Sequence, residues 1–167
     1  HNAHRRQRQM CIRDSVQGAK AVNSKVEVYQ NMTGTTPAAW NDPAKGSELA
    51  KSQFDRGADV VYAAAGGTGA GVYQAAADSG KLAIGVDSNQ NYMHPGTMLT
   101  SMLKRVDLAT YETFMDVKSG NFTSGVKVLG LAEDGVGWAF DEYNKPLITD
   151  VMKSTINGLS DKVKSGS

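Results

Sequence analysis

The sequence predicts an α/β fold with a parallel sheet and helices on both faces. Two short apolar runs, residues 58–65 and 81–87, are typical of strands that are covered on both sides. A segment with the properties of a helix lies between them, and glycines separate the first run from that helix. Strands and helices that alternate along a chain in this way form parallel sheets.

The first part of the sequence contains signals for two helices and a strand. Residues 16–22 are expected to be the end of a helix, and residues 25–30 alternate between apolar and polar side chains, as a strand does. Asp42 is expected to cap the next helix, with Pro43 in its first turn, where the missing N–H costs nothing. Gly57 is expected to end that helix.

A glycine turn follows the strand at residues 58–65. Gly66 and Gly67 lead into a helix that we expect at residues 72–79. A strand that ends in glycines before a helix leaves backbone N–H groups bare at the carboxyl edge of a sheet, where such sheets bind ligands. Glycine also lets a ligand approach the backbone closely. The alternative is a tight connection without a ligand.

The remaining elements are predicted from apolar runs and helical spacing. They are strands at residues 81–87 and 97–103, a helix from Asp107 to Gly120, extended segments at 126–131 and 136–140, and a helix from about Pro146 to Val163.

Composition limits the classes of function. A chain of 167 residues can form one domain with a sizeable core. Four of its six arginines precede Ser15, and without residues 1–15 the 18 basic and 17 acidic side chains become 14 and 16. A body with this mildly acidic balance gives no reason to expect a nucleic-acid partner. No apolar run approaches the length of a membrane span, and one cysteine, Cys11, excludes an internal disulfide.

Residues 1–15 differ in composition from the rest of the chain. They show no apolar periodicity, and no apolar region follows their arginines as it would in a signal peptide. We interpret them as a non-native or disordered segment, with a basic arm for an anionic partner as the alternative. The functional domain is therefore expected at residues 16–167.

Candidate ligand-binding residues lie at the expected carboxyl ends of the strands or in the loops beside them: Trp40, Gly66, Gly67, Asp87 and Lys104. An aromatic ring can stack on a flat base, which contributes about 1–3 kcal/mol. A carboxylate can accept hydrogen bonds from both hydroxyls of a ribose, each worth about 1.5–3 kcal/mol, and a nearby lysine can donate to the sugar. Each residue also has a purely structural interpretation: Trp40 as a loop anchor, Asp87 as a cap of the following loop and Lys104 as a solvated charge.

Enzymatic interpretations find little support. Gly67-Thr68-Gly69 lacks the third glycine of a dinucleotide fingerprint at the required spacing, although an acid follows at Asp87. No Gly-Lys-Ser/Thr follows the glycines, no serine lies in a Gly-x-Ser-x-Gly elbow, and no His/Cys/Asp spacing suggests a metal. We therefore expect no enzyme activity, no cofactor and no metal ion.

Five motifs occur in order along the chain: Trp40–Gly46, Gly57–Val61, Ala64–Gly69, Gly85–Gln90 and Thr100–Asp107. With these motifs the sequence resembles the basic membrane protein family, which comprises the purine nucleoside receptor-like substrate-binding lipoproteins of ABC transporters. The resemblance extends from about Val16 to Lys164.

The resemblance implies a type I periplasmic-binding-protein fold, with two α/β lobes and a purine nucleoside in the cleft between them. It implies that Trp40 stacks on the base, that Gly66 and Gly67 line the cleft, and that Asp87 and Lys104 hold the ribose. It further implies an ABC permease as partner and an extracytoplasmic, lipid-anchored location for the full-length protein, whose signal and lipobox we do not find in this sequence.

The chain departs from the family in length, because members are about twice as long. We therefore expect a C-terminal part of the fold, with the N-terminal lobe missing and with impaired binding. The helix from Asp107 and the segment near Val126 would then have partly bare apolar faces. Binding or sensing of another sugar-type solute is the alternative on the same fold, and an enzyme with a nucleotide cofactor is a further alternative.

Overall fold

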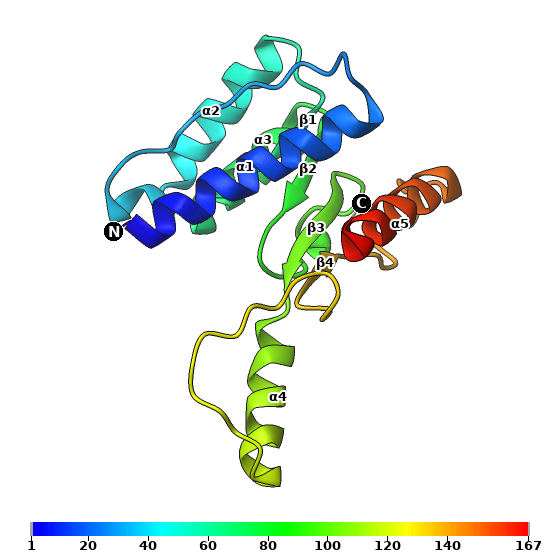
Figure 1. The fold of residues 1–167 in the computed structure, drawn as a ribbon. Coiled ribbons are helices and arrows are strands. Elements are labelled where there is room, and N and C mark those ends of the chain that lie inside the picture. The colour runs from blue at the N-terminus through cyan, green and yellow to red at the C-terminus, as the bar shows by residue number, and fades with distance from the viewer. Residues whose placement is uncertain (1, 167) are drawn as a thin grey trace. The chain divides into compact units, whose positions relative to one another are not determined.

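The computed structural model describes residues 2–166, and their side chains from Ile12 onward. Figure 1 shows the helices and strands along the chain. Their bounds are α1 Asn2–Val22, η1 Pro37–Trp40, α2 Pro43–Asp55, β1 Val60–Tyr62, η2 Gly66–Thr68, α3 Gly69–Asp78, β2 Leu82–Gly85, η3 Asn91–Met93, β3 Met98–Lys104, α4 Val106–Ser119, β4 Val136–Trp138 and α5 Asp150–Ser165. The chain forms two compact units, His1–Ala83 and Ile84–Ser167, which are described separately.

Helix α2 begins and ends as the sequence predicts. The Asp42 side chain accepts a hydrogen bond from the Lys45 N–H at 2.9 Å, and Pro43 occupies the first turn. The helix ends at Asp55, two residues before Gly57, whose φ is +97°. These signals act between residues within one helical turn, so local sequence is sufficient to specify them.

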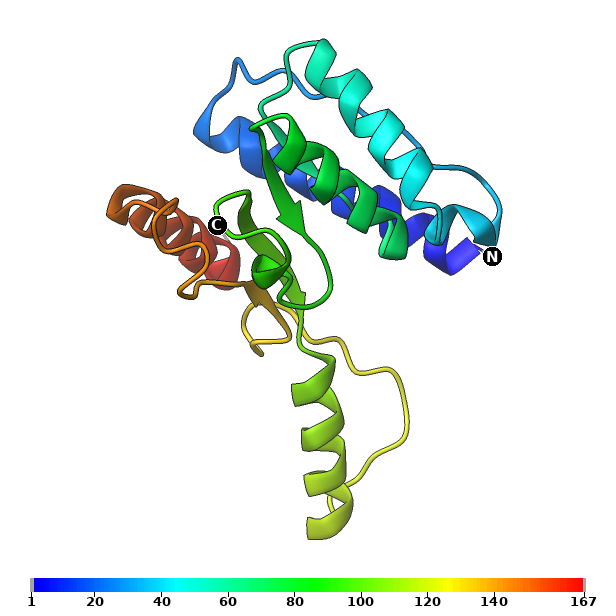
Figure 2. The same ribbon diagram turned by 180° about the vertical axis from the view of Figure 1, so that it is seen from behind.

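The core of the first unit lies mainly between α2 and α3. Ala50 and Phe54 are buried on α2, and Tyr73, Ala75 and Ala76 are buried on α3. The two helices are seen side by side in both ribbon views, Figures 1 and 2.

Glycines allow the backbones of α2 and α3 to approach closely. A Cβ atom at Gly71 would collide with the backbone carbonyl group of Pro43, and one at Gly46 would collide with the carbonyl oxygen of Thr68. Helix α3 begins at Gly69 rather than at the expected Val72, because the single turn η2 runs directly into it. The glycines are therefore part of the helix pair as well as of the turn.

Residues 25–30 are not a strand, so the prediction from their alternating pattern is wrong. Within the described residues they form irregular chain, in which Val26 N–H donates to the Asn23 carbonyl. Tyr29 contacts Arg56, whose guanidinium carbon lies 3.9 Å from the ring centroid. Alternation describes a half-buried surface, but a strand also needs a neighbouring strand for its backbone groups.

The four strands form one mixed sheet in the order β1-β2-β3-β4, and the division between the units falls within β2. Strand β4 runs antiparallel to β3, with Met102 opposite Trp138 and Lys104 opposite Val136. The α/β fold class is confirmed, and this antiparallel pair makes the sheet mixed rather than wholly parallel. After α4 the chain returns to the end of β3, where the Arg105 N–H donates to the Gly135 carbonyl at 2.9 Å, so that β4 must run back along β3.

Helix α4 and the segment after it expose apolar side chains, as the resemblance implies. Phe114 on α4 is 70% exposed, Val126 is 96% exposed, and α4 has no buried residue. The expected strand at residues 126–131 is irregular, and it lies beside α4 (Figure 2), where Lys127 forms an ion pair with Glu112 at 3.3 Å. Without a partner strand its backbone has no ladder to join.

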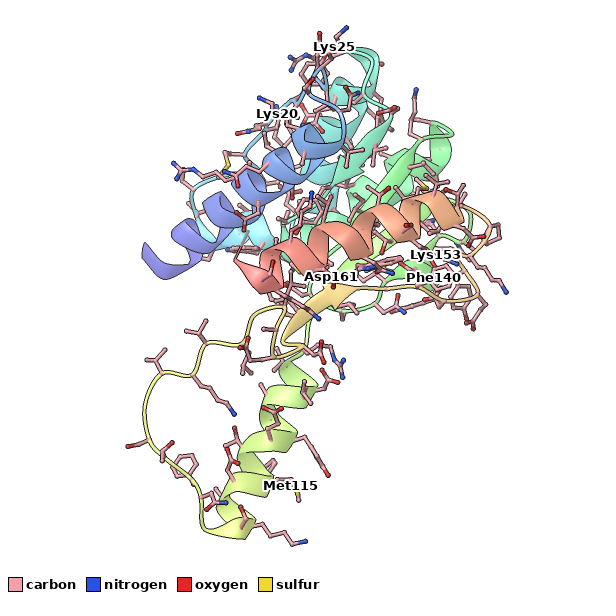
Figure 3. All side chains as sticks on the ribbon, turned by 45° about the vertical axis from the view of Figure 1, so that its right-hand side comes forward. Lys20, Lys25, Met115, Phe140, Lys153 and Asp161 are labelled. Atoms are coloured by element: carbon pink, nitrogen blue, oxygen red, sulfur yellow. The ribbon has the colours of Figure 1, made fainter. Side chains whose placement is uncertain are left out.

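Helix α5 begins at Asp150, later than the expected Pro146, because the Thr149 hydroxyl accepts a hydrogen bond from the Met152 N–H and caps the helix there. Val151, in the first turn of this helix, is 76% exposed. Before α5, Phe140 lies beneath the Lys153 ammonium group, which is 3.9 Å from the ring centroid (Figure 3).

Residues 2–15 form the first part of α1. Arginine, glutamine, alanine and methionine have high helix propensity, and a helix can form its backbone hydrogen bonds without apolar periodicity. The interpretation of residues 1–15 as a non-native or disordered segment stays a prediction. No helix among the described residues has both the length and the apolar character that crossing a membrane requires.

Candidate ligand-binding site

Trp40 and the glycine turn meet in the first unit. Trp40 is the last residue of η1 and is half-buried. A Cβ atom at Gly66 would lie 3.1 Å from Cε3 of the indole and 3.2 Å from the Trp40 carbonyl oxygen, and Gly66 has a φ of +59°. The turn is therefore shaped by a left-handed backbone that favours glycine, and the indole lies directly against it.

A buried threonine joins these two segments. The hydroxyl of Thr68, which is fully buried, donates to the Ala39 carbonyl and accepts from the Asp42 N–H, both at 2.8 Å. The same side chain thus connects η1, the cap of α2 and the glycine turn. Nothing in the sequence indicates this role, since threonine within a glycine-rich turn has no distinctive pattern.

Asp87 and Lys104 meet in the second unit. The Lys104 Nζ atom lies 2.6 Å from Oδ1 of Asp87, and the Lys104 N–H donates to the Asp87 carbonyl at 2.9 Å. Asp87 follows β2 and Lys104 ends β3, so neighbouring strands bring them together. The Asp87 side chain is 54% exposed, which leaves the pair accessible to solvent.

A polar network beside this pair was not predicted. The Asp141 carboxylate accepts hydrogen bonds from the side-chain amides of Asn89 at 2.7 Å and Asn91 at 3.1 Å. The Ser101 hydroxyl donates to the side-chain carbonyl of Asn91 at 2.8 Å, and both residues are fully buried. The polar run after Asp87 was the only sequence signal for this network, and nothing in the sequence indicated Asp141.

Asp141 is favoured in its charged form. Partial burial opposes ionisation, but hydrogen bonds from Asn89, the Tyr143 N–H, Asn91 and the Asn144 N–H together lower its pKa below the ordinary value. A carboxylate that accepts several hydrogen bonds holds its donors more strongly than a neutral acceptor does.

The structure brings the predicted site residues together in two groups. Trp40 lies against the Gly66–Gly67 turn, and Asp87 is paired with Lys104. Each group combines chemically complementary features: an aromatic face beside an open backbone, and a carboxylate beside an ammonium. Because the groups belong to different units, a single pocket that contains both stays a prediction.

Similarity to solved structures defines the class of protein. A solute-binding protein of an ABC transporter system from Aeropyrum pernix superposes with a TM-score of 0.74 at 26% identity, over 88% of this chain and 48% of that one. The fold is thus that of ABC transporter solute-binding proteins.

The family is defined more closely by sequence. The family described as "ABC transporter substrate-binding protein PnrA-like" matches residues 15–166, and the chain belongs to it. Basic membrane protein D of Borreliella burgdorferi is 34% identical over 155 residues, which are 85% of this chain and 44% of that relative. An uncharacterized lipoprotein of Pyrococcus horikoshii is 34% identical over 131 residues, which are 74% of this chain and 32% of that relative. The chain therefore spans less than half the length of these relatives.

Proposed function

We propose that this chain is the C-terminal part of a substrate-binding protein that captures a purine nucleoside between two lobes and delivers it to an ABC permease. Residues 16–167 would supply one side of the cleft, and residues 1–15 would lie outside the binding domain. Family membership supports a solute-binding role rather than catalysis, and the match that begins at residue 15 supports the domain boundary.

The Asp87–Lys104 pair is the observation that carries the nucleoside proposal. A carboxylate beside an ammonium offers acceptors and donors to the vicinal hydroxyls of a ribose. The ion pair, with Nζ 2.6 Å from Oδ1, keeps both groups in position for these contacts. Trp40 adds an aromatic face for the base, and Gly66 and Gly67 add backbone that a ligand can approach. The pair would thus bind the sugar of a nucleoside, and Trp40 would stack on its flat base.

A location outside the cytoplasm follows from this role. The relative from Pyrococcus horikoshii is named a lipoprotein. We propose that the full-length protein is likewise anchored to the plasma membrane by a lipid, where it would meet its permease.

Binding by this chain alone is expected to be weak. Two-lobed binding proteins gain affinity when the lobes close and bury the ligand. The one side of the cleft that this chain would supply keeps part of the ligand contacts but lacks the closure of the two lobes. Calorimetry should therefore detect little or no nucleoside binding. Submicromolar binding would show that the second side is dispensable or is supplied by another copy of the chain.

Titration by nuclear magnetic resonance (NMR) tests the proposal on the chain as it exists. Millimolar adenosine or guanosine should shift the Trp40 indole signal and the Asp87 and Lys104 amide signals. Asp87→Asn should reduce these shifts, whereas Asp59→Asn, an exposed carboxylate directly before β1, should leave them unchanged. Shifts produced by a different sugar-type solute, with no response to any nucleoside, would overturn the nucleoside assignment.

A further inference from the structure

The loop that presents Asp87 has a backbone conformation that requires support. Asp87 has a φ of +70°, in the left-handed region that residues with a side chain seldom adopt. Such a conformation persists only where the surrounding structure holds it. The Ser88 N–H donates to the Val86 carbonyl at 2.9 Å, which closes a tight turn around Asp87 itself.

Two contacts fix the loop close to Asp87. The Gln90 side-chain carbonyl accepts from the Val86 N–H at 2.9 Å, and the Gln90 N–H donates to the Ser101 hydroxyl at 3.0 Å. A Cβ atom at Gly85 would lie 2.6 Å from that hydroxyl, so the loop is seated closely on β3. These contacts hold the first part of the loop against the neighbouring strand.

Asp141 holds the far side of the loop. Its Oδ2 atom accepts from the side-chain amides of Asn89 and Asn91, at 2.7 and 3.1 Å, and its Oδ1 atom accepts from the Tyr143 N–H at 2.9 Å. Two amide NH₂ groups thus converge on one carboxylate oxygen. Only an acceptor satisfies both of them, because an NH₂ group at this position would face two donors.

Hydrogen bonds that involve Asn144 fix the position of Asp141. The Asp141 N–H donates to the Asn144 side-chain carbonyl at 2.9 Å, and the Asn144 side-chain amide donates to the Leu99 and Ala139 carbonyls, each at 2.9 Å. Asn144 is fully buried. Hydrogen bonds through Asp141 and Asn144 therefore connect the loop that carries Asp87 to β3 and to the turn after β4.

We propose that Asp141 is a positioning residue for the ligand site: its carboxylate, through Asn89 and Asn91, holds the loop in the conformation that places Asp87 against Lys104. That Asp87 and Lys104 bind a ligand rests on the proposed function. That Asp141 keeps Asp87 against Lys104 does not depend on any ligand. Asp141 has no contact with either member of the pair among the hydrogen bonds and ion pairs of the described residues.

NMR of the full chain tests the positional part. In Asp141→Asn the carbon-13 shifts of Asp87 should lose their left-handed character, and the Lys104 ammonium signal should broaden as the ion pair loosens. Glu142→Gln removes a neighbouring exposed charge and should change neither signal. Unchanged Asp87 and Lys104 signals in a folded Asp141→Asn protein would overturn the proposal.

Asn89→Ala provides a test that does not depend on the folding of Asp141→Asn. Asn89 is exposed, and this variant removes the 2.7 Å hydrogen bond to Asp141 together with the 3.0 Å hydrogen bond that the Asn91 N–H donates to the Asn89 side-chain carbonyl. It should shift the Asp87 signals in the same direction as Asp141→Asn, by a smaller amount. Retention of the parent signals in Asn89→Ala would contradict the proposed connection.

Adenosine and adenine separate this proposal from the proposed function. Asp141→Asn should weaken adenosine binding about tenfold and adenine binding very little, since only adenosine has the ribose that Asp87 and Lys104 would hold. A general structural defect would weaken both ligands equally, and that result would overturn the positioning role. If neither ligand binds the parent chain while Asp141→Asn still displaces Asp87, the nucleoside function fails and the control of the pair remains.

Discussion

Replacement of Thr68 by valine should destabilise the first unit strongly, although the two side chains have nearly the same shape. Valine removes the acceptor of the Asp42 N–H and the donor to the Ala39 carbonyl, both at 2.8 Å in a buried setting. Two lost hydrogen bonds of about 1 kcal/mol each, together with the cost of partners left unpaired, give a loss of about 2–4 kcal/mol. With a denaturant dependence of about 1.5 kcal/mol per molar urea, the unfolding midpoint should fall by about 2 M.

The two tryptophans allow this effect to be assigned to one unit. Trp40 lies in the first unit and Trp138 in the second, so a Trp138→Phe background makes fluorescence report the first unit during urea unfolding. Thr68→Ser keeps the hydroxyl and should lose only about 1 kcal/mol through the missing methyl group. A valine variant within about 0.5 kcal/mol of the parent would refute the reasoning.

Thr33→Val is the matched control for this experiment. The Thr33 hydroxyl oxygen is buried and has no hydrogen-bond partner among the described residues. Its removal relieves an unpaired polar atom, so the same substitution should be neutral or stabilise by up to about 1 kcal/mol. Opposite outcomes at Thr68 and Thr33 would show that hydrogen bonding, rather than the properties of valine, determines the change.

Three further predictions follow from packing, charge and exposure. Gly71→Ala should cost about 2 kcal/mol or more in urea unfolding, because its Cβ would collide with the Pro43 carbonyl group. The lowered pKa of Asp141 should stabilise the fold above about pH 4, so the stability advantage over Asp141→Asn should shrink as pH falls through the folded pKa. Phe114→Ser should lower the fluorescence of a bound apolar dye while thermal stability stays within about 0.5 kcal/mol, because Phe114 is largely exposed.

Local signals in the sequence predicted several elements correctly. The bounds of α2 follow from Asp42, Pro43 and Gly57, and the strand–glycine–helix stretch follows from an apolar run and the glycines after it. The pairing of Asp87 with Lys104 was also predictable in part, because it needs only that two successive strands be neighbours. The roles of these residues toward a ligand stay predictions.

Local sequence signals could not predict contacts between segments that are far apart in the chain. Residues 25–30 and 126–131 both have patterns typical of extended chain, yet neither is a strand, since no strand in the described part of the chain pairs with them. The direction of β4 depended on where the chain returned after α4. In each case the deciding partner lies outside the segment that carries the pattern.

By itself, the sequence determined where α2 begins and ends and which residues follow each strand, because capping and turn formation act over a few neighbouring positions. Only the tertiary structure decided that Asp141, 52 positions after Asn89, holds the loop of Asp87 and that Thr68 ties Ala39 to Asp42. The physical reason is that a buried polar group must find a partner wherever the folded chain provides one. Proximity in the folded chain determines that partner, and a local sequence pattern does not indicate which distant residues will be close.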